Sequence, residues 1–261
     1  MTTRPLVLIT GASSGIGLAL ARHYARAGWR LALVLRQNST IKNAFDADGI
    51  SAESYEFYNA DVRDIDAMVA LVARCVQRQG LPDVVIANAG ISVGVDTAHA
   101  ADLAVMAQVL QTNVLGVAAT LGPFSAPMAQ RGWGTLVGIA SVAGIRGLPG
   151  HGAYCASKAA VISYCESLRG ELRASGVKVV TLCPGYIATP LTANNGYRMP
   201  FLMSADDFAQ QAARAIARQT SYQVIPWPMA LVAKLLRWLP NAWFDHLLAG
   251  RPRKPRRSAE G

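Results

Sequence analysis

Residues 5–28 read PLVLITGASSGIGLALARHYARAG and combine three local signals in a fixed order. The apolar run PLVLIT has the length of a buried strand. Glycines at positions 11, 15 and 17 then interrupt the chain before a helical pattern begins at Leu18. Glycine permits a tight turn and lets backbone N–H groups at a helix N-terminus approach a pyrophosphate. The stretch therefore predicts a βα unit that binds a dinucleotide, while an ordinary βα turn is the alternative.

Apolar runs and helical patterns continue to alternate almost to the end of the chain, which is typical of βαβ units around a parallel sheet. The helical segment 64–80 has apolar residues at helical spacing, namely Ile65, Met68, Val69, Val72 and Val76. Seven strands are predicted: PLVLIT, RLALVL, SYEFYN, DVVIANA, GTLVGIAS, VKVVTLC and YQVI. We expect an α/β protein with a three-layer doubly wound Rossmann fold, a seven-stranded parallel sheet and short C-terminal amphipathic helices.

The chain of 261 residues fits one large α/β domain. We expect a dinucleotide-binding and catalytic domain over residues 1–225, a helical extension over 226–250 and a basic tail over 251–261. Ser204 and Asp207 form a variant of the capping box, so residues 185–203 are predicted to be a long loop before a late helix. Long loops in compact domains are usually functional, and this one is expected to border the substrate.

Composition argues against several other classes of protein. Hydrophobic residues are 52% of the chain, and the four cysteines show no metal-ligand spacing, so we expect reduced thiols, a cytoplasmic location and no metal site. The net charge is +9, but residues 251–261 hold five basic residues and one acidic residue. Residues 1–250 therefore carry only +5, and no nucleic-acid partner is predicted.

A second decisive stretch is GHGAYCASKAAVISYCESLRG at residues 150–170, which places Tyr154 and Lys158 four residues apart. On a helix these two side chains share a face. A positive charge beside a phenol favours the phenolate, so we expect Lys158 to lower the pKa of Tyr154. Taken alone, the pair also fits an amphipathic helix with an exposed lysine and a half-buried tyrosine.

The glycine turn and the Tyr-Lys pair together resemble the short-chain dehydrogenase/reductase family in its smaller single-domain form. The resemblance covers residues 5 to about 225. The family's TGxxxGxG motif corresponds to Thr10, Gly11, Gly15 and Gly17, and its NNAG motif appears with Ala87 in place of the first asparagine. The resemblance implies a cofactor site formed by Gly11, Ser13, Ser14, Gly15, Ile16, Gly17, Arg36, Asp61, Val62, Asn88, Ala89, Gly90, Tyr154, Lys158, Pro184, Gly185, Ile187 and Thr189.

The resemblance also implies a catalytic tetrad of Asn113, Ser141, Tyr154 and Lys158. In the family, hydride passes between the nicotinamide and a carbonyl carbon. By resemblance, Tyr154 would be the general acid or base, Ser141 would polarise the carbonyl and Asn113 would hold a water in the proton relay. A dinucleotide sensor or scaffold that lost the chemistry is an alternative, which the intact tetrad disfavours.

The second predicted strand ends at Leu35 and Arg36, where an acidic residue would favour NAD. A guanidinium can pair with a 2′-phosphate, so NADP(H) is favoured over NAD(H). A solvent-facing arginine and an NAD-linked alcohol dehydrogenase remain the alternatives.

Apolar residues of the long loop suggest a bulky hydrophobic carbonyl compound, although a lid that merely packs on the core fits as well. The candidate substrate residues are Ile145, Tyr186, Leu191, Tyr197 and Phe201.

Prolines and charges prevent residues 226–250 from forming an uninterrupted membrane span. This extension and the basic tail could lie peripherally on the inner membrane surface, or cover the cleft or a neighbouring subunit. A homodimer or homotetramer is implied by the resemblance alone.

Overall fold

The computed structural model describes residues 4–36, 39–193, 195–250 and 252–256. Its main sheet has the strand order β3-β2-β1-β4-β5-β6-β9, and every neighbouring pair is parallel. The strands are β1 (Leu6–Thr10), β2 (Arg30–Leu35), β3 (Tyr55–Asn59), β4 (Val84–Ala87), β5 (Gly134–Ile139), β6 (Val177–Pro184) and β9 (Tyr222–Ile225). The predicted Rossmann fold with seven parallel strands is therefore confirmed.

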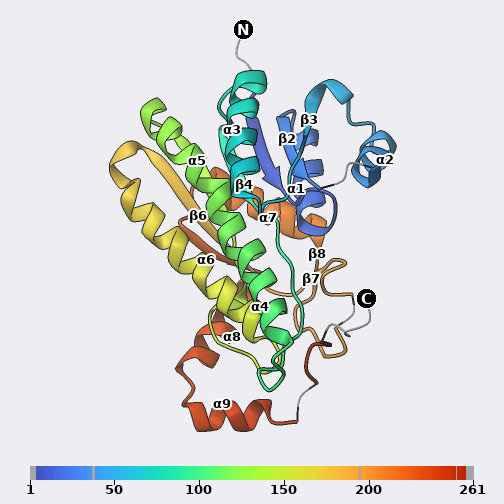
Figure 1. The fold of residues 1–261 in the computed structure, drawn as a ribbon, viewed down its shortest axis with the longest axis vertical. Helices are drawn as coiled ribbons and strands as arrows, with labels where there is room; N and C mark the ends of the chain where they lie inside the picture. The colour runs from blue at the N-terminus through green and yellow to red at the C-terminus, as the bar shows by residue number, and fades with distance from the viewer. Residues whose placement is uncertain (1–3, 37–38, 194, 251, 257–261) are drawn as a thin grey trace.

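Helices cover both faces of this sheet (Figure 1). They are α1 (Gly15–Arg26), α2 (Ser39–Ala47), α3 (Ile65–Gln79), α4 (Asp102–Leu110), α5 (Gly116–Arg131), α6 (Gly152–Glu171) and α7 (Ala205–Ala217). Alternate residues of the strands point to opposite faces. Val7 and Ile9 pack in one cluster with residues of α1, α2 and α7, and Leu6 and Leu8 pack in the other with residues of α3, α5 and α6.

The buried face of α3 differs from the face predicted by spacing. Met68 and Val72 are buried as expected, whereas Ile65 and Val69 are about half exposed. Leu71 and Cys75 are buried in their place. The helix is therefore rotated so that Leu71 and Cys75 meet the sheet, because burying a leucine removes more apolar surface from water than burying a valine.

Residues 102–131 form one continuous helical run that includes a π-helical turn, Gln111–Leu115, between α4 and α5. Among the described residues it is the one helix long and apolar enough to cross a membrane. Its two halves contact α3, α6 and β4, so we interpret it as part of the helical layer that covers the sheet.

The segment between β6 and α7 is not entirely loop. A two-residue strand, β7 (Ile187–Ala188), pairs with β8 (Met203–Ser204) at the two ends of the segment. Ser204 then caps α7, since its hydroxyl accepts from the backbone N–H of Asp207 at 3.0 Å. Most of the predicted loop therefore lies between β7 and β8, and the pairing of these two strands joins its ends.

The chain after β9 forms two helices, α8 (Trp227–Trp238) and α9 (Asn241–Leu248). Arg146 joins them to the body of the protein. Its guanidinium donates to the carbonyls of Leu236 and Leu239 and to Asn241 Oδ1, and it stacks over the ring of Phe244 at 3.8 Å. The C-terminal segment then returns toward the carboxyl end of the sheet (Figure 1).

Candidate active site

A cleft of about 1060 Å³ lies at the carboxyl ends of the strands. The order of the sheet reverses between β1 and β4, so the connections after these two strands leave toward opposite faces. In a doubly wound fold this switch point is where a crevice opens. The cleft brings together residues from the connections after β1, β2, β3, β4, β5 and β6.

Most of the residues predicted to form the site line this cleft. They are Gly11, Ser13, Ser14, Gly15, Ile16, Arg36, Asp61, Val62, Asn88, Ala89, Gly90, Ser141, Tyr154, Lys158, Pro184, Gly185, Ile187, Thr189 and Leu191. Six predicted residues do not line it: Gly17, Asn113, Ile145, Tyr186, Tyr197 and Phe201. The lining residues absent from the prediction include Val34, Leu35, Ala60, Arg63, Ile91, Val93, Gln108 and Thr112. Most of these flank a predicted residue in the sequence, which is the signal that could have found them.

The glycine turn is shaped by close approaches of the backbone. Gly11 has φ +67°, and a Cβ there would lie 2.8 Å from the Cα of Ala89. Gly15 has φ +54° and begins α1 beside Thr189. Gly17 faces inward instead, where a Cβ would collide with the Gly11 carbonyl. Gly17 is therefore needed for packing within the turn, and its predicted contact with the cofactor stays a prediction.

Thr10 and Asn88 hold the ends of β1 and β4 together at the floor of the cleft. The Thr10 hydroxyl accepts from the backbone N–H groups of Asn88 and Ala89 at 3.1 and 3.2 Å. The Asn88 amide donates back to the carbonyls of Thr10 and Gly11 at 3.0 and 3.2 Å. The cradle formed by the glycine turn is thus supported by hydrogen bonds, and its open backbone fits a dinucleotide phosphate.

At the opposite end of the cleft, Asp61 is paired with Arg63, a residue that the sequence analysis missed. The guanidinium contacts both carboxylate oxygens, with an Nη2–Oδ2 distance of 2.6 Å. This hydrogen bonding lowers the pKa of Asp61, and the nearby charge of Arg36 acts in the same direction. Asp64, not Asp61, caps α3 by accepting from the N–H of Ala67 at 2.9 Å.

Ser141, Tyr154 and Lys158 meet where β5 ends and α6 begins. Ser141 follows β5, and its Oγ accepts from the N–H of Ala143 at 3.2 Å. Tyr154 and Lys158 lie one turn apart on α6. The Lys158 ammonium is 4% exposed and donates to the carbonyl of Ile139 at 2.8 Å. The three functional groups therefore converge on one side of the cleft.

The protein's own groups do not lower the pKa of Tyr154. Burial raises it to about 12, although hydrogen bonding to Ser141 opposes this effect. Burial also lowers the pKa of Lys158 to about 8, because desolvation disfavours the ammonium. Burial of the phenol therefore decides the direction of the shift within the chain. The lowering of the pKa that was expected from Lys158 stays a prediction.

Asn113 lies in the π-helical turn with its side chain fully engaged. Its Oδ1 accepts from the N–H of Ile91 at 2.8 Å, and its Nδ2 donates to the Ile91 carbonyl and to Ser157 Oγ at 2.9 and 3.0 Å. The side chain is fully buried and joins α6 to the loop after β4. Both N–H donors of this amide are used within the chain, so a water could bind only to Oδ1 or to the backbone carbonyl, and the predicted role in the proton relay stays a prediction.

The candidate substrate residues separate in space. Leu191 lines the cleft, whereas Ile145 and Tyr186 pack against the core and Phe201 is about half exposed with φ +56°. Tyr197 is close enough to Tyr154 to interact electrostatically, and its hydroxyl lies 3.0 Å from His151 Nε2. Among the described residues no group of three or more His, Cys, Asp or Glu side chains could hold a metal ion.

Comparisons with known proteins agree with this geometry. A family model described as short chain dehydrogenase matches residues 5–199. An uncharacterized oxidoreductase of Myxococcus xanthus is 38% identical over 241 residues, which are 91% of this chain and 94% of that protein. A short chain dehydrogenase/reductase from Burkholderia phymatum, solved with NAD, has a TM-score of 0.80 at 25% identity and covers 97% of this chain and 98% of its own. An actinorhodin polyketide ketoreductase solved with NADPH has a TM-score of 0.76 at 28% identity, over 86% and 97% of the two chains.

Proposed function

Because the chain belongs to the short chain dehydrogenase family, we propose that it is an NADP(H)-dependent oxidoreductase that reduces the carbonyl group of a bulky hydrophobic compound. The observation that carries the proposal is the convergence of Ser141, Tyr154 and Lys158 on the cleft that also contains the glycine turn. When bound, the nicotinamide would supply the hydride. The residues of the chain bind, orient and exchange the proton.

Ser141 and Tyr154 are the two groups that would hold the substrate oxygen. The Ser141 hydroxyl would donate a hydrogen bond to the oxygen as negative charge develops on it. Since the pKa of Tyr154 is raised, its phenol is neutral near pH 7 and has a proton to give. This protonation state favours carbonyl reduction over alcohol oxidation at neutral pH.

Lys158 would stabilise the phenolate that forms once Tyr154 has given up its proton. With a pKa of about 8, the ammonium is still mostly protonated at pH 7 and can also release a proton readily. The side chain of Asn113 is occupied by Ile91 and Ser157, so we propose that it positions the loop after β4 and that any water contact uses its backbone carbonyl.

Arg36 supports the preference for NADP(H). It lines the cleft, is exposed, and forms no ion pair with the described residues. Arg63 in contrast is already paired with Asp61. A guanidinium without a carboxylate partner at the end of β2 is suited to a 2′-phosphate.

The apolar lining supports a hydrophobic substrate, since Ile91, Val93 and Leu191 face the cleft. The similarity to a polyketide ketoreductase is in keeping with this choice. The proposal is tested by following NADPH oxidation with hydrophobic aldehydes and ketones, with Tyr154→Phe as the matched variant. Turnover by the wild type that Tyr154→Phe abolishes supports it. Tight NADPH binding without any turnover would instead favour a dinucleotide sensor.

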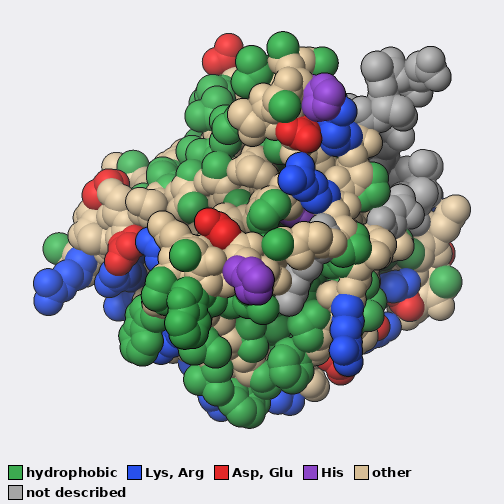
Figure 2. Space-filling view, turned by 90° about the horizontal axis from the view of Figure 1, so that it is seen from below, with side chains coloured by type: hydrophobic (Ala, Val, Ile, Leu, Met, Phe, Trp, Pro, Cys, Tyr) green, Lys and Arg blue, Asp and Glu red, His purple; other side chains and the backbone are tan. Residues whose placement is uncertain are grey.

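We also propose that α8 and α9 rest on a membrane surface. Trp227, Trp238 and Trp243 are at least 70% exposed, and Leu231 and Leu235 project from α8 beside them. Figure 2 shows apolar side chains gathered over the end of the molecule at which α8 and α9 lie, with basic side chains around them. Exposed tryptophans beside lysine and arginine are typical of helices that lie in a membrane interface. On its buried side α8 packs through Met229 on Gly185, a residue that lines the cleft.

The described part of the basic tail forms ion pairs within the chain. Residues 252–256 lie against the protein, and Arg253 and Arg256 pair with Asp96 and Asp102. Their charges are therefore partly neutralised by carboxylates of the same chain; the rest of the predicted tail lies outside the described residues.

A homo-oligomer through the helices that carry Asn113 and Tyr154 remains a proposal, supported by the exposure of Leu115 between α4 and α5.

A further inference from the structure

The described C-terminal residues 252–256, here called the strap, run beside the loop that follows β4. The backbone N–H of Gly94 donates to the carbonyl of Pro255 at 3.2 Å, and Gly94 forms an isolated parallel bridge with Arg256. A Cβ at Gly94 would collide with the Lys254 carbonyl, and one at Gly150 would lie 2.8 Å from the Cβ of Arg253. Two glycines thus leave the space in which the strap lies.

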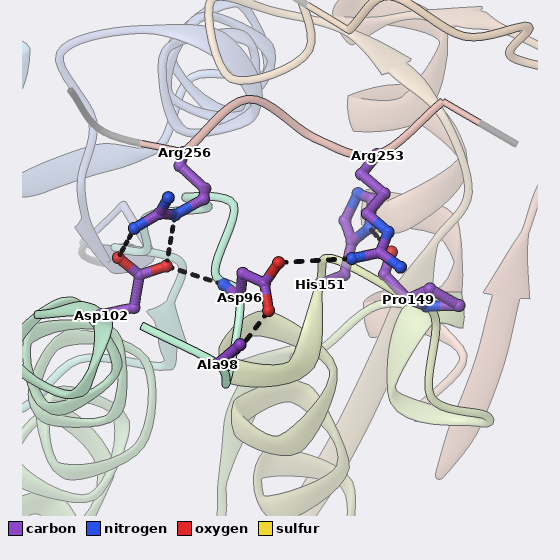
Figure 3. Close-up of polar contacts among 7 residues, drawn as sticks. All are labelled: Asp96, Ala98, Asp102, Pro149, His151, Arg253 and Arg256. Carbon is purple, nitrogen blue, oxygen red and sulfur yellow. Dashed lines mark hydrogen bonds and ion pairs between the residues drawn. The ribbon is translucent and has the colours of Figure 1, made fainter. Parts of the chain in front are cut away.

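Two arginines anchor the strap through ion pairs (Figure 3). Arg256 forms a bidentate pair with Asp102, at 2.8 Å from Nε to Oδ2 and 2.9 Å from Nη2 to Oδ1. The same carboxylate accepts from the N–H of Asp96 at 2.7 Å, and these contacts lower the pKa of Asp102 to about 2. Arg253 lies 3.4 Å from Asp96. Both arginines are therefore used within the chain.

Lys254, between the two arginines, has a different environment. It is the one partly buried residue of the strap. Its ammonium donates to Ser92 Oγ at 2.8 Å and to the carbonyl of Leu191 at 3.3 Å. Leu191 and the two neighbours of Ser92, Ile91 and Val93, line the cleft. The ammonium does not itself line the cleft, but it joins the two segments that carry these lining residues.

The charge of Lys254 has no carboxylate partner among the described residues. An ammonium has three N–H donors, and the two contacts in the structure use neutral oxygens. Burial lowers the pKa of this lysine, because the charged form is desolvated without compensation. A ligand anion would supply the missing charge and a third acceptor.

We propose that Lys254 determines substrate specificity by binding an anionic group of the substrate, a carboxylate or a phosphate, at a distance from the reacting carbonyl. The inference rests on the proposed reductase function and narrows its substrate class to hydrophobic carbonyl compounds that end in an anion. The arginines hold the strap in place, so the lysine charge is not needed for that purpose. The ammonium would set the orientation in which the chain of the substrate enters the cleft.

The test uses pairs of probes that share the ketone and the carbon chain and of which only one member carries an anionic group. A series of methyl-ketone carboxylic acids of increasing length is compared with the corresponding methyl esters. Phosphate monoesters of hydroxyketones are compared with the free hydroxyketones, which distinguishes the two anions. Steady-state kinetics with NADPH are measured for the wild type, Lys254→Met and Lys254→Arg. Lys178→Met is the control, since Lys178 is an exposed lysine at the start of β6, at the opposite end of the strand from the cleft.

We expect the wild type to favour one class of anion over its neutral partner by about tenfold in kcat/KM at the best chain length. Lys254→Met should remove this preference, because KM for the anion should rise by about tenfold more than KM for the neutral partner. Lys254→Arg should retain part of the preference for the anion, and Lys178→Met should retain all of this preference. Equal losses for anionic and neutral probes in Lys254→Met would assign a purely structural role to the lysine and overturn the inference, as would a preference for the neutral probes.

A binding measurement separates this inference from the proposed function. The rise in Tm caused by each acid or phosphate is measured with NADPH present for the wild type and Lys254→Met. If the anion raises Tm of the wild type but not of Lys254→Met, and no probe is turned over, the anion site is supported and the reductase proposal fails. If neutral ketones are turned over but the anions have no effect on Tm or KM, the reductase proposal is supported and the role of Lys254 is refuted.

Discussion

The ammonium of Lys158 donates to the carbonyl of Ile139 at 2.8 Å and lies 5.8 Å from the centre of the Tyr154 ring. The last residue of β5 thus holds the lysine one helical turn beyond the tyrosine. The lysine acts on the phenol through its charge, across a distance set by the packing of α6 on β5.

The pH dependence of carbonyl reduction should follow the ammonium of Lys158. The pKa of this lysine is lowered to about 8, so the charge that stabilises the phenolate of Tyr154 is present below that pH and is lost above it. We expect kcat/KM to be level between about pH 6 and 7.5 and to fall by about tenfold per unit at higher pH. Lys158→Arg should extend the level region upward. A wild-type profile that stays level to about pH 10 would contradict this role.

Cofactor preference should depend on Arg36. Arg36→Ala is expected to raise the Kd for NADPH by about tenfold or more and to change the Kd for NADH little, because only NADPH carries the 2′-phosphate. Fluorescence titration measures both constants. Arg63→Ala is the comparison, since Arg63 already pairs with Asp61. Equal weakening of NADPH and NADH by Arg36→Ala would refute the assignment.

Two glycines of different environment should respond oppositely to alanine. Gly17→Ala places a methyl group against the Gly11 carbonyl and 2.6 Å from the Asn88 amide, so we expect a large loss of stability and of cofactor binding. Gly170 is exposed on α6 with nothing within 4 Å of the added Cβ. Gly170→Ala should therefore stabilise the protein by about 0.5–1 kcal/mol. Urea denaturation compares the two, and a tolerated Gly17→Ala would show that the turn can move.

Arg131 should contribute to stability through the carbonyls that it satisfies. Its guanidinium donates to the carbonyls of Leu81, Pro82 and Trp133 and stacks on the Trp133 ring at 3.7 Å. Arg131→Met leaves these acceptors without their donors, so we expect the free energy of unfolding to fall by about 1–3 kcal/mol. Arg169→Met, at an exposed arginine 4.0 Å from Glu166, should change it by less than about 0.5 kcal/mol. Similar losses in both variants would argue against a special role for Arg131.

Membrane binding, if α8 and α9 provide it, should be lost when the exposed tryptophans are removed. We expect the wild type to sediment with vesicles that contain anionic lipid, and the double variant Trp238→Ser with Trp243→Ser to remain in the supernatant. Trp133→Ser is the matched control, because Trp133 is a half-exposed tryptophan at the start of β5, outside α8 and α9. If the double variant sediments like the wild type, or if the wild type does not sediment with the vesicles, α8 and α9 are excluded as the membrane-binding surface.

The limits of the sequence are clearest at residues whose neighbours are distant in the chain. Asn113 belongs to the motif that predicted it, yet its contacts with Ile91 and Ser157 depend on how α6 packs against the loop after β4. The pKa of Tyr154 was predicted from one neighbour, whereas burial by the whole fold decides its direction. Arg63 follows the predicted residue Val62, but no periodicity predicts its ion pair with Asp61, because the two residues are two positions apart and lie outside a helix.

The sequence by itself determined the order of strands and helices, the glycine turn and the face shared by Tyr154 and Lys158. These features depend on local backbone geometry and on apolar periodicity, which a single stretch of chain already contains. Only the tertiary structure decided that Gly17 faces inward, that the strap returns to pair Arg256 with Asp102, and that Lys254 joins two segments that carry lining residues of the cleft. The contacts of Arg256 with Asp102 and of Lys254 with Ser92 join residues more than 150 positions apart, and where a chain returns depends on the packing of every element between them.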